Sequence, residues 1–212
     1  MKVKLISHST TDLPVGGALD LVAYCARVSN PSNQHNKDTN EKLIKYLIKN
    51  KHWSPLEMVS ACIEITTTRD IARQILRHRS FSFQEFSQRY ADPTSDLGFE
   101  IREARMQDLT NRQNSVPCTD PKIEKEWKAA QSHVIEQARK AYDFAISAGI
   151  AKEQARSVLP EGNTVSRMYV NGSLRSWIHY IDLRAANGTQ LEHMEIAKAI
   201  AKVIHKIFPV TL

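Results

Sequence analysis

The sequence predicts an α+β fold: a single domain, residues 1–212, in which several helices pack against a small mixed β-sheet and long helices lie toward the C-terminus. Three observations lead to this fold class. Apolar residues recur at helical spacing over several segments, other segments alternate between apolar and polar residues, and the two kinds do not follow one another in regular βαβ order. With 42% apolar and 25% charged residues, the chain has the composition of an ordinary globular domain.

The N-terminal half contains strands and helices in mixed order. Strands are predicted where residues alternate in character, over VKLISHS at residues 3–9 and MVSACIEITTT at 58–68. Helices are predicted where apolar residues return every three or four positions, over residues 17–29, 39–50 and 69–77. Thr39 or Asn40 can cap the second of these helices.

The C-terminal half is predicted to be mostly helical. Residues 91–118, rich in Asp, Pro, Ser and Asn, are expected to form a loop with one short strand near FEIREARM. The clearest helix follows, from Pro121 to Ala148, with Asp120 suited to its start and Gly149 to its end. Trp127 lies on its apolar stripe and is expected in the core. Further helices are predicted over residues 151–160, 164–187 and 190–208.

The net charge and the cysteine content indicate which partners and which cell compartment to expect for the protein. The net charge of +6 favours anionic partners such as phosphates or nucleic acid. Three cysteines stand far apart, at Cys25, Cys62 and Cys118, which fits a reducing compartment and not a disulfide framework. The N-terminal stretch lacks the pattern of a signal peptide, and no apolar run approaches the ~20 residues of a membrane span. We therefore expect a cytoplasmic protein with no membrane partner.

Common nucleotide and metal motifs are missing from the sequence. Neither a GxGxxG nor a GxxxxGK[ST] loop occurs, which makes a Rossmann or P-loop site unexpected. HExxH is also absent, and we expect His193, Glu195 and His205 to be solvated on an amphipathic helix, with no bound metal.

Residues 77–90, RHRSFSFQEFSQRY, concentrate guanidinium groups, rings, a carboxylate and hydroxyls in one short segment. As a strand, residues 81–89 would place Glu85, Ser87 and Arg89 on one side. The carboxylate and hydroxyl can recognise a ribose or a base edge, and guanidinium groups suit phosphate. Upstream, Arg69, Arg73 and Arg77 would share a helix face, which taken alone indicates a solvated basic surface. Together the two segments predict a site for a flat, anionic ligand.

A second hypothesis is that the same segment binds single-stranded nucleic acid. Basic residues interleaved with Phe81, Phe83, Phe86 and Tyr90 could form a stacking platform over phosphate contacts. The acidic Glu85 inside the segment and the low aromatic content of 7% weigh against it.

The segment also resembles the signature of the flavin-dependent thymidylate synthases, RHRxxSxxxxSxR. Six residues fall in register with it: Arg77, His78, Arg79, Ser82, Ser87 and Arg89. HWSPLE, residues 52–57, resembles the HxSPxE segment of that family. ARSVLP around Arg156 and LRSWIHYIDLR at 174–184 are similar to the C-terminal substrate and flavin segments of the family, so the resemblance covers most of the chain.

This resemblance implies a homotetramer with active sites built from several subunits, and no nucleic-acid partner. It implies methylation of dUMP to dTMP, with FAD passing reducing equivalents from NADPH and methylenetetrahydrofolate supplying the carbon. Because reduced flavin serves in that family, a cysteine nucleophile is not expected.

The resemblance also assigns residues by position. Arg184 and Ser87 are expected to act in the chemistry. The dUMP contacts it implies are Gln74, Ile75, Leu76, Arg77, Glu85, Phe86, Ser87, Gln88, Arg89, Arg156 and Arg184. The FAD contacts it implies are His52, Ser54, Glu57, Arg77, His78, Arg79, Glu85, Ser173, Leu174, Arg175 and His179.

Overall fold

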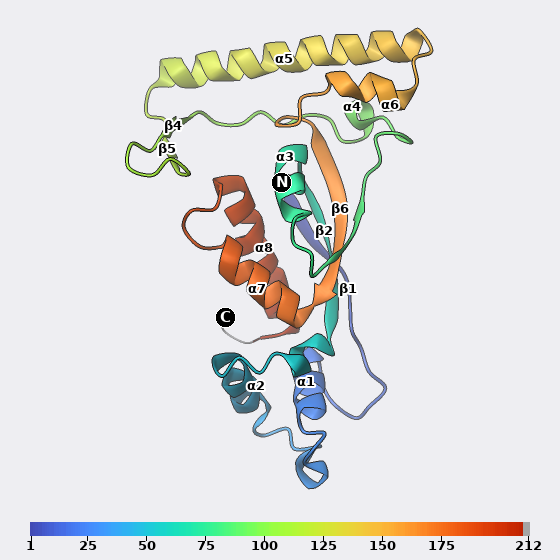
Figure 1. Ribbon diagram of the computed structural model, residues 1–212, viewed down its shortest axis with the longest axis vertical. Helices are drawn as coiled ribbons and strands as arrows, with labels where there is room; N and C mark the ends of the chain where they lie inside the picture. The colour runs from blue at the N-terminus through green and yellow to red at the C-terminus, as the bar shows by residue number, and fades with distance from the viewer. Residues whose placement is uncertain (210–212) are drawn as a thin grey trace.

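A four-stranded antiparallel sheet runs through the computed structural model, which describes residues 1–209 (Figure 1). Its strands, in spatial order, are β1 (Lys2–His8), β2 (Ser60–Thr68), β6 (Val165–Ser173) and β3 (Ser82–Glu85). The α+β class is confirmed. The expectation of a mixed sheet is wrong, because every neighbouring pair of strands runs in opposite directions.

Strand β6 is the largest departure from the sequence prediction. A single helix was expected over residues 164–187, but β6 occupies the first part and helix α7 (Leu174–Arg184) the second. Every second residue of β6 is buried, and these are Ser166, Met168, Val170 and Gly172. Two of the four are not apolar, so the period of two is masked in the sequence. Pairing with β2 along the whole strand, and with β3 on the other side, stabilises β6 in place.

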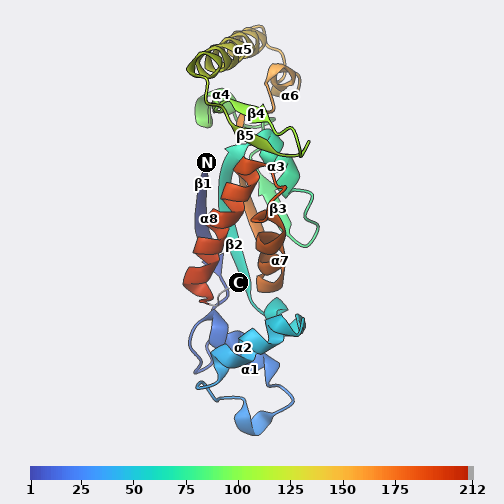
Figure 2. The same ribbon diagram turned by 90° about the vertical axis from the view of Figure 1, so that its left-hand side faces the viewer.

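Three helices cover one face of this sheet (Figures 1 and 2). They are α3 (Arg69–Ile75), α7, and α8 (Leu191–Ile207). Ile63 and Ile65 of β2 pack with Trp177 of α7 in one core, all fully or almost fully buried. The alternation predicted for β2 is confirmed, since each of its isoleucines faces that core. The sheet and these helices form the frame on which the candidate site is built.

The two ends of the molecule carry the other elements (Figure 1). One end holds α1 (Ala18–Ala26), α2 (Asn40–Lys49) and the short 3-10 helices η1 (Pro31–Asn33) and η2 (Ser54–Glu57). The opposite end holds α4 (Pro93–Asp96), β4 (Arg105–Gln107), β5 (Ser115–Pro117), α5 (Pro121–Ser147), α6 (Lys152–Ala155) and η3 (Arg156–Val158). Two short strands thus occupy the segment 91–118, where one was expected.

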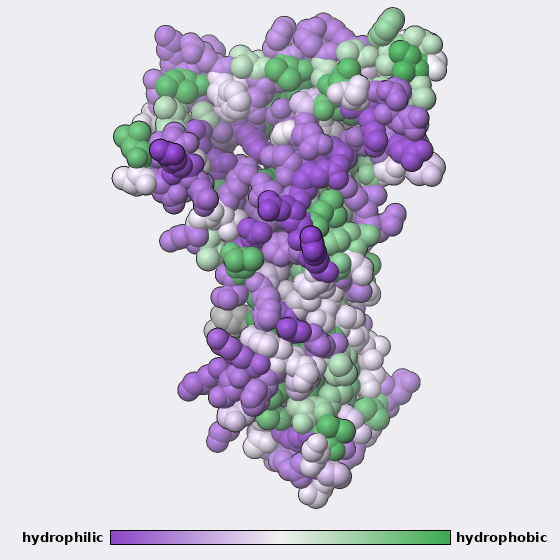
Figure 3. All heavy atoms as spheres, in the orientation of Figure 1, coloured by the Kyte–Doolittle hydropathy of each residue, from purple (hydrophilic) through white to green (hydrophobic). Residues whose placement is uncertain are grey.

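Helix α5 begins and ends as predicted, but its apolar stripe is mostly uncovered. Asp120 accepts a hydrogen bond from the Lys122 backbone N–H at 2.8 Å, and Gly149 has φ of +77° just beyond the helix. The expectation that Trp127 lies in the core is wrong, because 46% of its surface is exposed. A small apolar cluster around Tyr142 and Ala145 packs beneath the helix. Hydrophobic residues therefore lie among hydrophilic ones on the surface of α5 (Figure 3).

No helix within residues 1–209 combines the length and the apolar character needed to cross a bilayer.

Candidate active site

Residues 77–90, called the signature loop below, are anchored to the sheet and to α7 through Phe81. Its ring lies 4.5 Å from that of Trp177, between centroids. A Cβ atom at Gly172 would lie 2.3 Å from Phe81 Cδ1, so only glycine leaves room for the ring. The Ser176 hydroxyl donates a hydrogen bond to the backbone carbonyl of Ser80 at 3.1 Å. This anchoring holds the neighbouring Arg77 and Arg79 at the surface, where both are exposed.

The same packing weakens the nucleic-acid hypothesis. Phe81 and Phe83 are half-buried and pack against the main core, so their faces are not free for bases to stack on. Phe86 is also half-buried, and only Tyr90 is largely exposed, at 83%. A continuous stacking platform needs several open rings, which this segment does not present.

Residues 81–89 do not form one continuous strand, contrary to the sequence prediction. Strand β3 ends at Glu85, and Ser87 begins a turn in which its carbonyl accepts from the Tyr90 backbone N–H at 3.1 Å. Ser87 and Arg89 therefore do not line up with Glu85 on one strand face. The turn instead directs Arg89 toward α6, where it lies 3.3 Å from Glu153.

Glu85 lies at the centre of a charged cluster. It accepts a hydrogen bond from the Ser166 hydroxyl at 2.8 Å, and its two carboxylate oxygens lie 3.7 Å from Arg69 and 3.6 Å from Arg73. Arg69 is only 8% exposed, so the interpretation of a solvated basic face is wrong for it. Helix α3 also ends at Ile75, before Arg77, so the three arginines do not share one helix face.

A second group of expected site residues gathers around the end of α7. The Arg184 Nε–H donates to His78 Nε2 at 2.9 Å, which leaves the terminal guanidinium nitrogens of Arg184 for other partners. Burial, together with the charges of Arg184 and Arg77, lowers the pKa of His78. His78 is therefore neutral near pH 7, with its proton on Nδ1.

The structure adds two residues that the sequence analysis did not assign, Tyr180 and His193. His193 is fully buried, and the expectation that it is solvated is wrong. Its Nε2 lies 3.0 Å from the Tyr180 hydroxyl, and its Nδ1 lies 3.2 Å from Gln74 Oε1. The one signal in the sequence is its place on the same helix stripe as Ile196 and Ile200, which are also buried.

We group the candidate residues into two clusters. The helix-side cluster comprises Gln74, His78, Tyr180, Arg184 and His193: hydrogen bonds join Arg184 to His78 and join Gln74, His193 and Tyr180, and the His78 and Tyr180 rings lie 4.9 Å apart between centroids. The turn-side cluster comprises Gln88, Arg89 and Arg156. Arg156 begins η3 directly after α6, which also carries the Glu153 partner of Arg89. Within residues 1–209, no hydrogen bond or ion pair joins a residue of one cluster to a residue of the other.

The turn-side cluster contains a buried donor with no partner. Gln88 is 4% exposed, and its side-chain nitrogen has no hydrogen-bond partner within the described part of the chain. Such a group costs about 1–3 kcal/mol when it stays unpaired. A ligand or another subunit that accepts this hydrogen bond would remove the cost.

Four of the expected flavin contacts line one cavity of about 470 Å³. Its lining residues are Glu57, Ser80, Ser173, Arg175, Ser176 and His179. Arg175 and Glu57 form an ion pair at its wall. The ring of Trp53 packs edge-on against that of His179, with centroids 4.4 Å apart. Ser80 also lines the cavity, so the cavity adjoins the Arg77–Arg79 triplet. The cationic and hydroxyl groups that line the cavity suit an anionic dinucleotide.

Other expected residues lie outside this cavity. His52 is exposed and its ring packs against that of Tyr46, and Ser54 lines a separate cavity of about 490 Å³. The side chains of Ile75 and Leu174 are buried in the core. Any ligand contact of these two residues would use backbone atoms.

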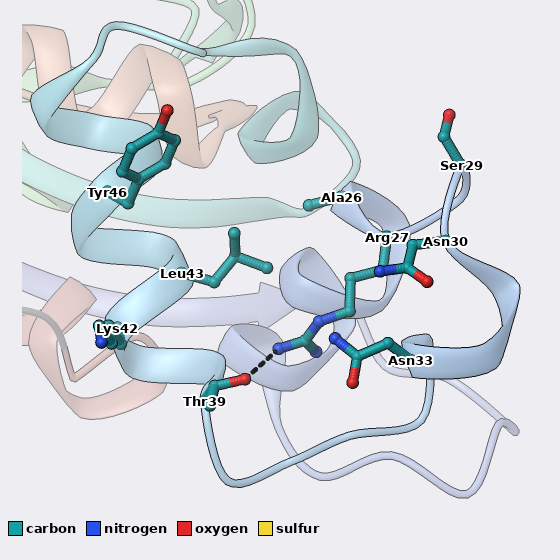
Figure 4. Close-up of a pocket in the computed structure, with 9 residues that line it drawn as sticks. All are labelled: Ala26, Arg27, Ser29, Asn30, Asn33, Thr39, Lys42, Leu43 and Tyr46. Atoms are coloured by element: carbon teal, nitrogen blue, oxygen red, sulfur yellow. Dashed lines mark hydrogen bonds between the residues drawn. The ribbon is translucent and has the colours of Figure 1, made fainter.

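A further cavity, of about 460 Å³, lies between α1 and α2 (Figure 4). None of the expected site residues lines it. Arg27 is 6% exposed there and donates to the Asn36 carbonyl at 2.7 Å and to the Thr39 hydroxyl at 3.0 Å. Through these bonds the Arg27 guanidinium connects α1 to the segment that leads into α2, so it is already engaged within the protein.

The three cysteines lie on separate segments of the fold, in α1, in β2 and just after β5. Cys25, Cys62 and Cys118 are free and partly buried. Burial raises the pKa of the Cys62 thiol, which disfavours the thiolate that a nucleophile requires. Within residues 1–209, no three His, Cys, Asp or Glu side chains are grouped to hold a metal ion.

Comparison with known proteins identifies the family. Residues 4–210 match the family described as thymidylate synthase complementing protein. A flavin-dependent thymidylate synthase from Synechocystis is 50% identical over 99% of this chain and 96% of that protein. The chain belongs to the flavin-dependent thymidylate synthases. A probable flavin-dependent thymidylate synthase of Paramecium bursaria Chlorella virus 1 is 45% identical over the same shares.

Comparison with a solved structure supports the fold. The UMP/dUMP methylase PolB from Streptomyces cacaoi, bound with 5-Br dUMP, superimposes with a TM-score of 0.79 at 25% identity. The match covers 97% of this chain and 90% of that one.

Proposed function

We propose that this protein methylates dUMP to dTMP with FAD as cofactor, and that the clusters and cavity described above form its active site. The observation that carries the proposal is the complete Arg77–Arg89 signature, held on the sheet of a chain that belongs to this family. The chain is thus an FAD-dependent methyltransferase. NADPH as reductant and methylenetetrahydrofolate as carbon donor are the co-substrates that we propose.

The turn-side cluster binds the anionic end of dUMP in this account. Guanidinium groups form strong, often bidentate hydrogen bonds with phosphate, which suits Arg89 and Arg156. The unpaired amide nitrogen of Gln88 supplies a further donor. Ser87, which starts the same turn, can place its hydroxyl beside the nucleotide.

The helix-side cluster acts on the uracil ring. The ring becomes a better nucleophile when its N3 proton is withdrawn or the resulting anion is stabilised. Arg184 can stabilise that anion, because His78 occupies its Nε and leaves the terminal amino groups free. Because His78 is neutral, it orients the Arg184 guanidinium without adding a second positive charge that would compete for the uracil anion.

The cavity beside Ser80 and Arg175 is the place we propose for FAD. The ion pair with Glu57 orients the Arg175 guanidinium, and His179 is held by Trp53. When bound, FAD reduced by NADPH supplies the hydride that the methylation requires. The exposed Arg77 and Arg79 would balance the charge of its phosphates.

We further propose a homotetramer in which each active site combines the helix-side cluster of one subunit with the turn-side cluster of another. Two observations support this. No hydrogen bond or ion pair joins the two clusters within residues 1–209, and α5 exposes large apolar side chains, including Trp127, Val134 and Phe144. Apolar surface of this kind is stabilised when a second subunit covers it.

A dUMP-dependent assay tests the proposed function. Purified protein supplied with FAD, NADPH, methylenetetrahydrofolate and dUMP should be yellow, oxidise NADPH only when dUMP is present, and form dTMP. UMP is the comparison substrate, because the related methylase from Streptomyces cacaoi is named for both nucleotides. A colourless protein that forms no dTMP and binds oligonucleotides with a steep salt dependence would contradict the proposal.

A further inference from the structure

A chain of hydrogen bonds runs from the helix-side cluster toward β4. Its members, in order, are Tyr180, His193, Gln74, Gln190, Glu192 and Arg105. They come from α7, α8, α3, the loop before α8, and β4. Five of the six are far from the signature loop in sequence, and only Gln74 is an expected substrate contact.

The Glu192 end fixes the direction of the first bonds in this chain. Glu192 pairs with Arg105 and, as a carboxylate, can only accept hydrogen bonds. The Gln190 atom that faces it, at 2.9 Å, must therefore be the amide nitrogen. The carbonyl oxygen of Gln190 then faces Gln74, so Gln74 Nε2 donates to it at 2.8 Å.

The same logic continues into the core. With Nε2 of Gln74 engaged, its carbonyl oxygen faces His193, so His193 Nδ1 must carry the proton. His193 Nε2 then accepts from the Tyr180 hydroxyl at 3.0 Å. Burial, together with the charge of Arg184, lowers the pKa of His193 to about 4, which agrees with a neutral ring. One carboxylate thus determines every donor and acceptor as far as Tyr180.

Packing alone does not account for a histidine at this position. His193 is fully buried on the stripe that continues with Ile196 and Ile200. An apolar residue would fill that place without needing polar partners. The histidine instead meets Gln74 on one side and Tyr180 on the other.

We propose that His193 is a positioning residue, which holds the Gln74 amide in one orientation for substrate binding. In that orientation Gln74 keeps one N–H and one carbonyl lone pair free, and its side chain is half-buried. The free N–H faces an acceptor on the substrate. The inference rests on the proposed function, in which Gln74 contacts dUMP.

A double-mutant cycle on the FAD-loaded enzyme tests this role. The variants are His193→Leu, Gln74→Leu and the pair, and the dissociation constant for dUMP is measured by calorimetry. We expect each single change to weaken dUMP binding by roughly tenfold, the effect of about one lost hydrogen bond. The double variant should bind no more weakly than Gln74→Leu alone, because His193 acts only through Gln74.

Two milder variants keep the test valid if His193→Leu fails to fold. Glu192→Gln keeps the shape but removes the carboxylate, and His193→Asn keeps a donor near the Nδ1 position. We expect Glu192→Gln to weaken dUMP binding several-fold in the wild-type background and not at all with Gln74→Leu. His193→Asn should retain more affinity than His193→Leu. Glu195→Gln, an exposed change on the same helix, is the matched control and should be silent.

The measurements distinguish failure of the positioning role from failure of the Gln74 contact and from failure of the proposed function. If Gln74→Leu weakens dUMP binding but His193→Leu and Glu192→Gln do not, or if the effects add in the double variants, the positioning role is wrong. If Gln74→Leu itself leaves dUMP binding unchanged, the assignment of Gln74 as a substrate contact is wrong and the inference with it. Absence of dTMP formation by the unmodified enzyme would overturn the proposed function itself.

Discussion

The helix-side and turn-side clusters differ in how completely one subunit satisfies them. On the helix side, Arg184, His78 and Gln74 already hold hydrogen bonds to fixed partners. On the turn side, Arg89 meets only an exposed carboxylate, and the buried amide of Gln88 has no partner within residues 1–209. The difference indicates that the two clusters have different roles. The groups that we propose to act on the ring are oriented before the substrate arrives, whereas those that we propose to bind its anionic end would be completed by the ligand or a second subunit.

The largest effect is expected at Arg184, in the oriented cluster. Arg184→Ala removes the charge that we propose lies beside the uracil, and Arg184→Lys keeps a charge but loses the planar fork. Turnover to dTMP should fall at least about tenfold in both, approaching the hundredfold or more typical of a lost transition-state donor. The flavin absorbance should stay unchanged, which separates chemistry from cofactor loss. Near-normal turnover in both variants would remove Arg184 from the mechanism.

Arg89, in the turn-side cluster, should affect binding and not chemistry. Arg89→Ala is expected to weaken dUMP binding by roughly 1.5 to 3 kcal/mol, as for a charged hydrogen bond. Its ion pair with Glu153 is exposed and contributes little to folding stability, so the variant should fold. Calorimetry measures the dissociation constant, with Arg112→Ala on an exposed loop as the control. Equal constants for the two variants would contradict the assignment.

Gly172 tests whether the signature loop depends on its anchor in the sheet. A Cβ atom there would lie 2.3 Å from a ring that already packs against Trp177. Gly172→Ala should lower the free energy of unfolding by about 1 to 3 kcal/mol, as overpacking does. Gly162→Ala is the control, because its added Cβ meets nothing within 4 Å. Denaturant unfolding that shows equal stabilities for the two variants would mean that Phe81 moves without cost.

The smallest effect is expected at the cysteines, which belong to neither cluster. The variant carrying Cys25→Ala, Cys62→Ala and Cys118→Ser should still form dTMP, with some loss of thermal stability from the partly buried changes. A variant that folds and binds both FAD and dUMP, yet forms no dTMP, would show that a thiolate takes part after all.

Local features of the fold could be predicted from the sequence. The start and end of α5 followed from Asp120 and Gly149, because capping depends on residues next to the helix. The signature loop could also be predicted, because its residues are contiguous in the sequence. The exposure of Trp127 was not predictable in this way. Which part of the α5 stripe is covered depends on what packs beneath the helix.

Long-range features could not be predicted. The identity of β6 as a strand depends on its pairing with β2, which lies about a hundred residues earlier in the chain. The network around His193 likewise joins α3, α7 and α8, and no spacing within one segment marks it. Sequence patterns locate residues on one element, whereas these contacts arise only when several elements are packed together.

Mixing two impaired variants tests most directly whether each active site combines the two clusters from different subunits. Subunits with Arg184→Ala and subunits with Arg89→Ala are co-expressed, and dTMP formation is measured at a low dUMP concentration, where each variant alone keeps at most about a tenth of the wild-type activity. If the helix-side and turn-side clusters of one site come from different subunits, random assembly leaves about a quarter of the sites with both arginines intact. We therefore expect about a quarter of the wild-type activity to return. Activity that stays at the level of the single variants would show that both clusters act within one subunit.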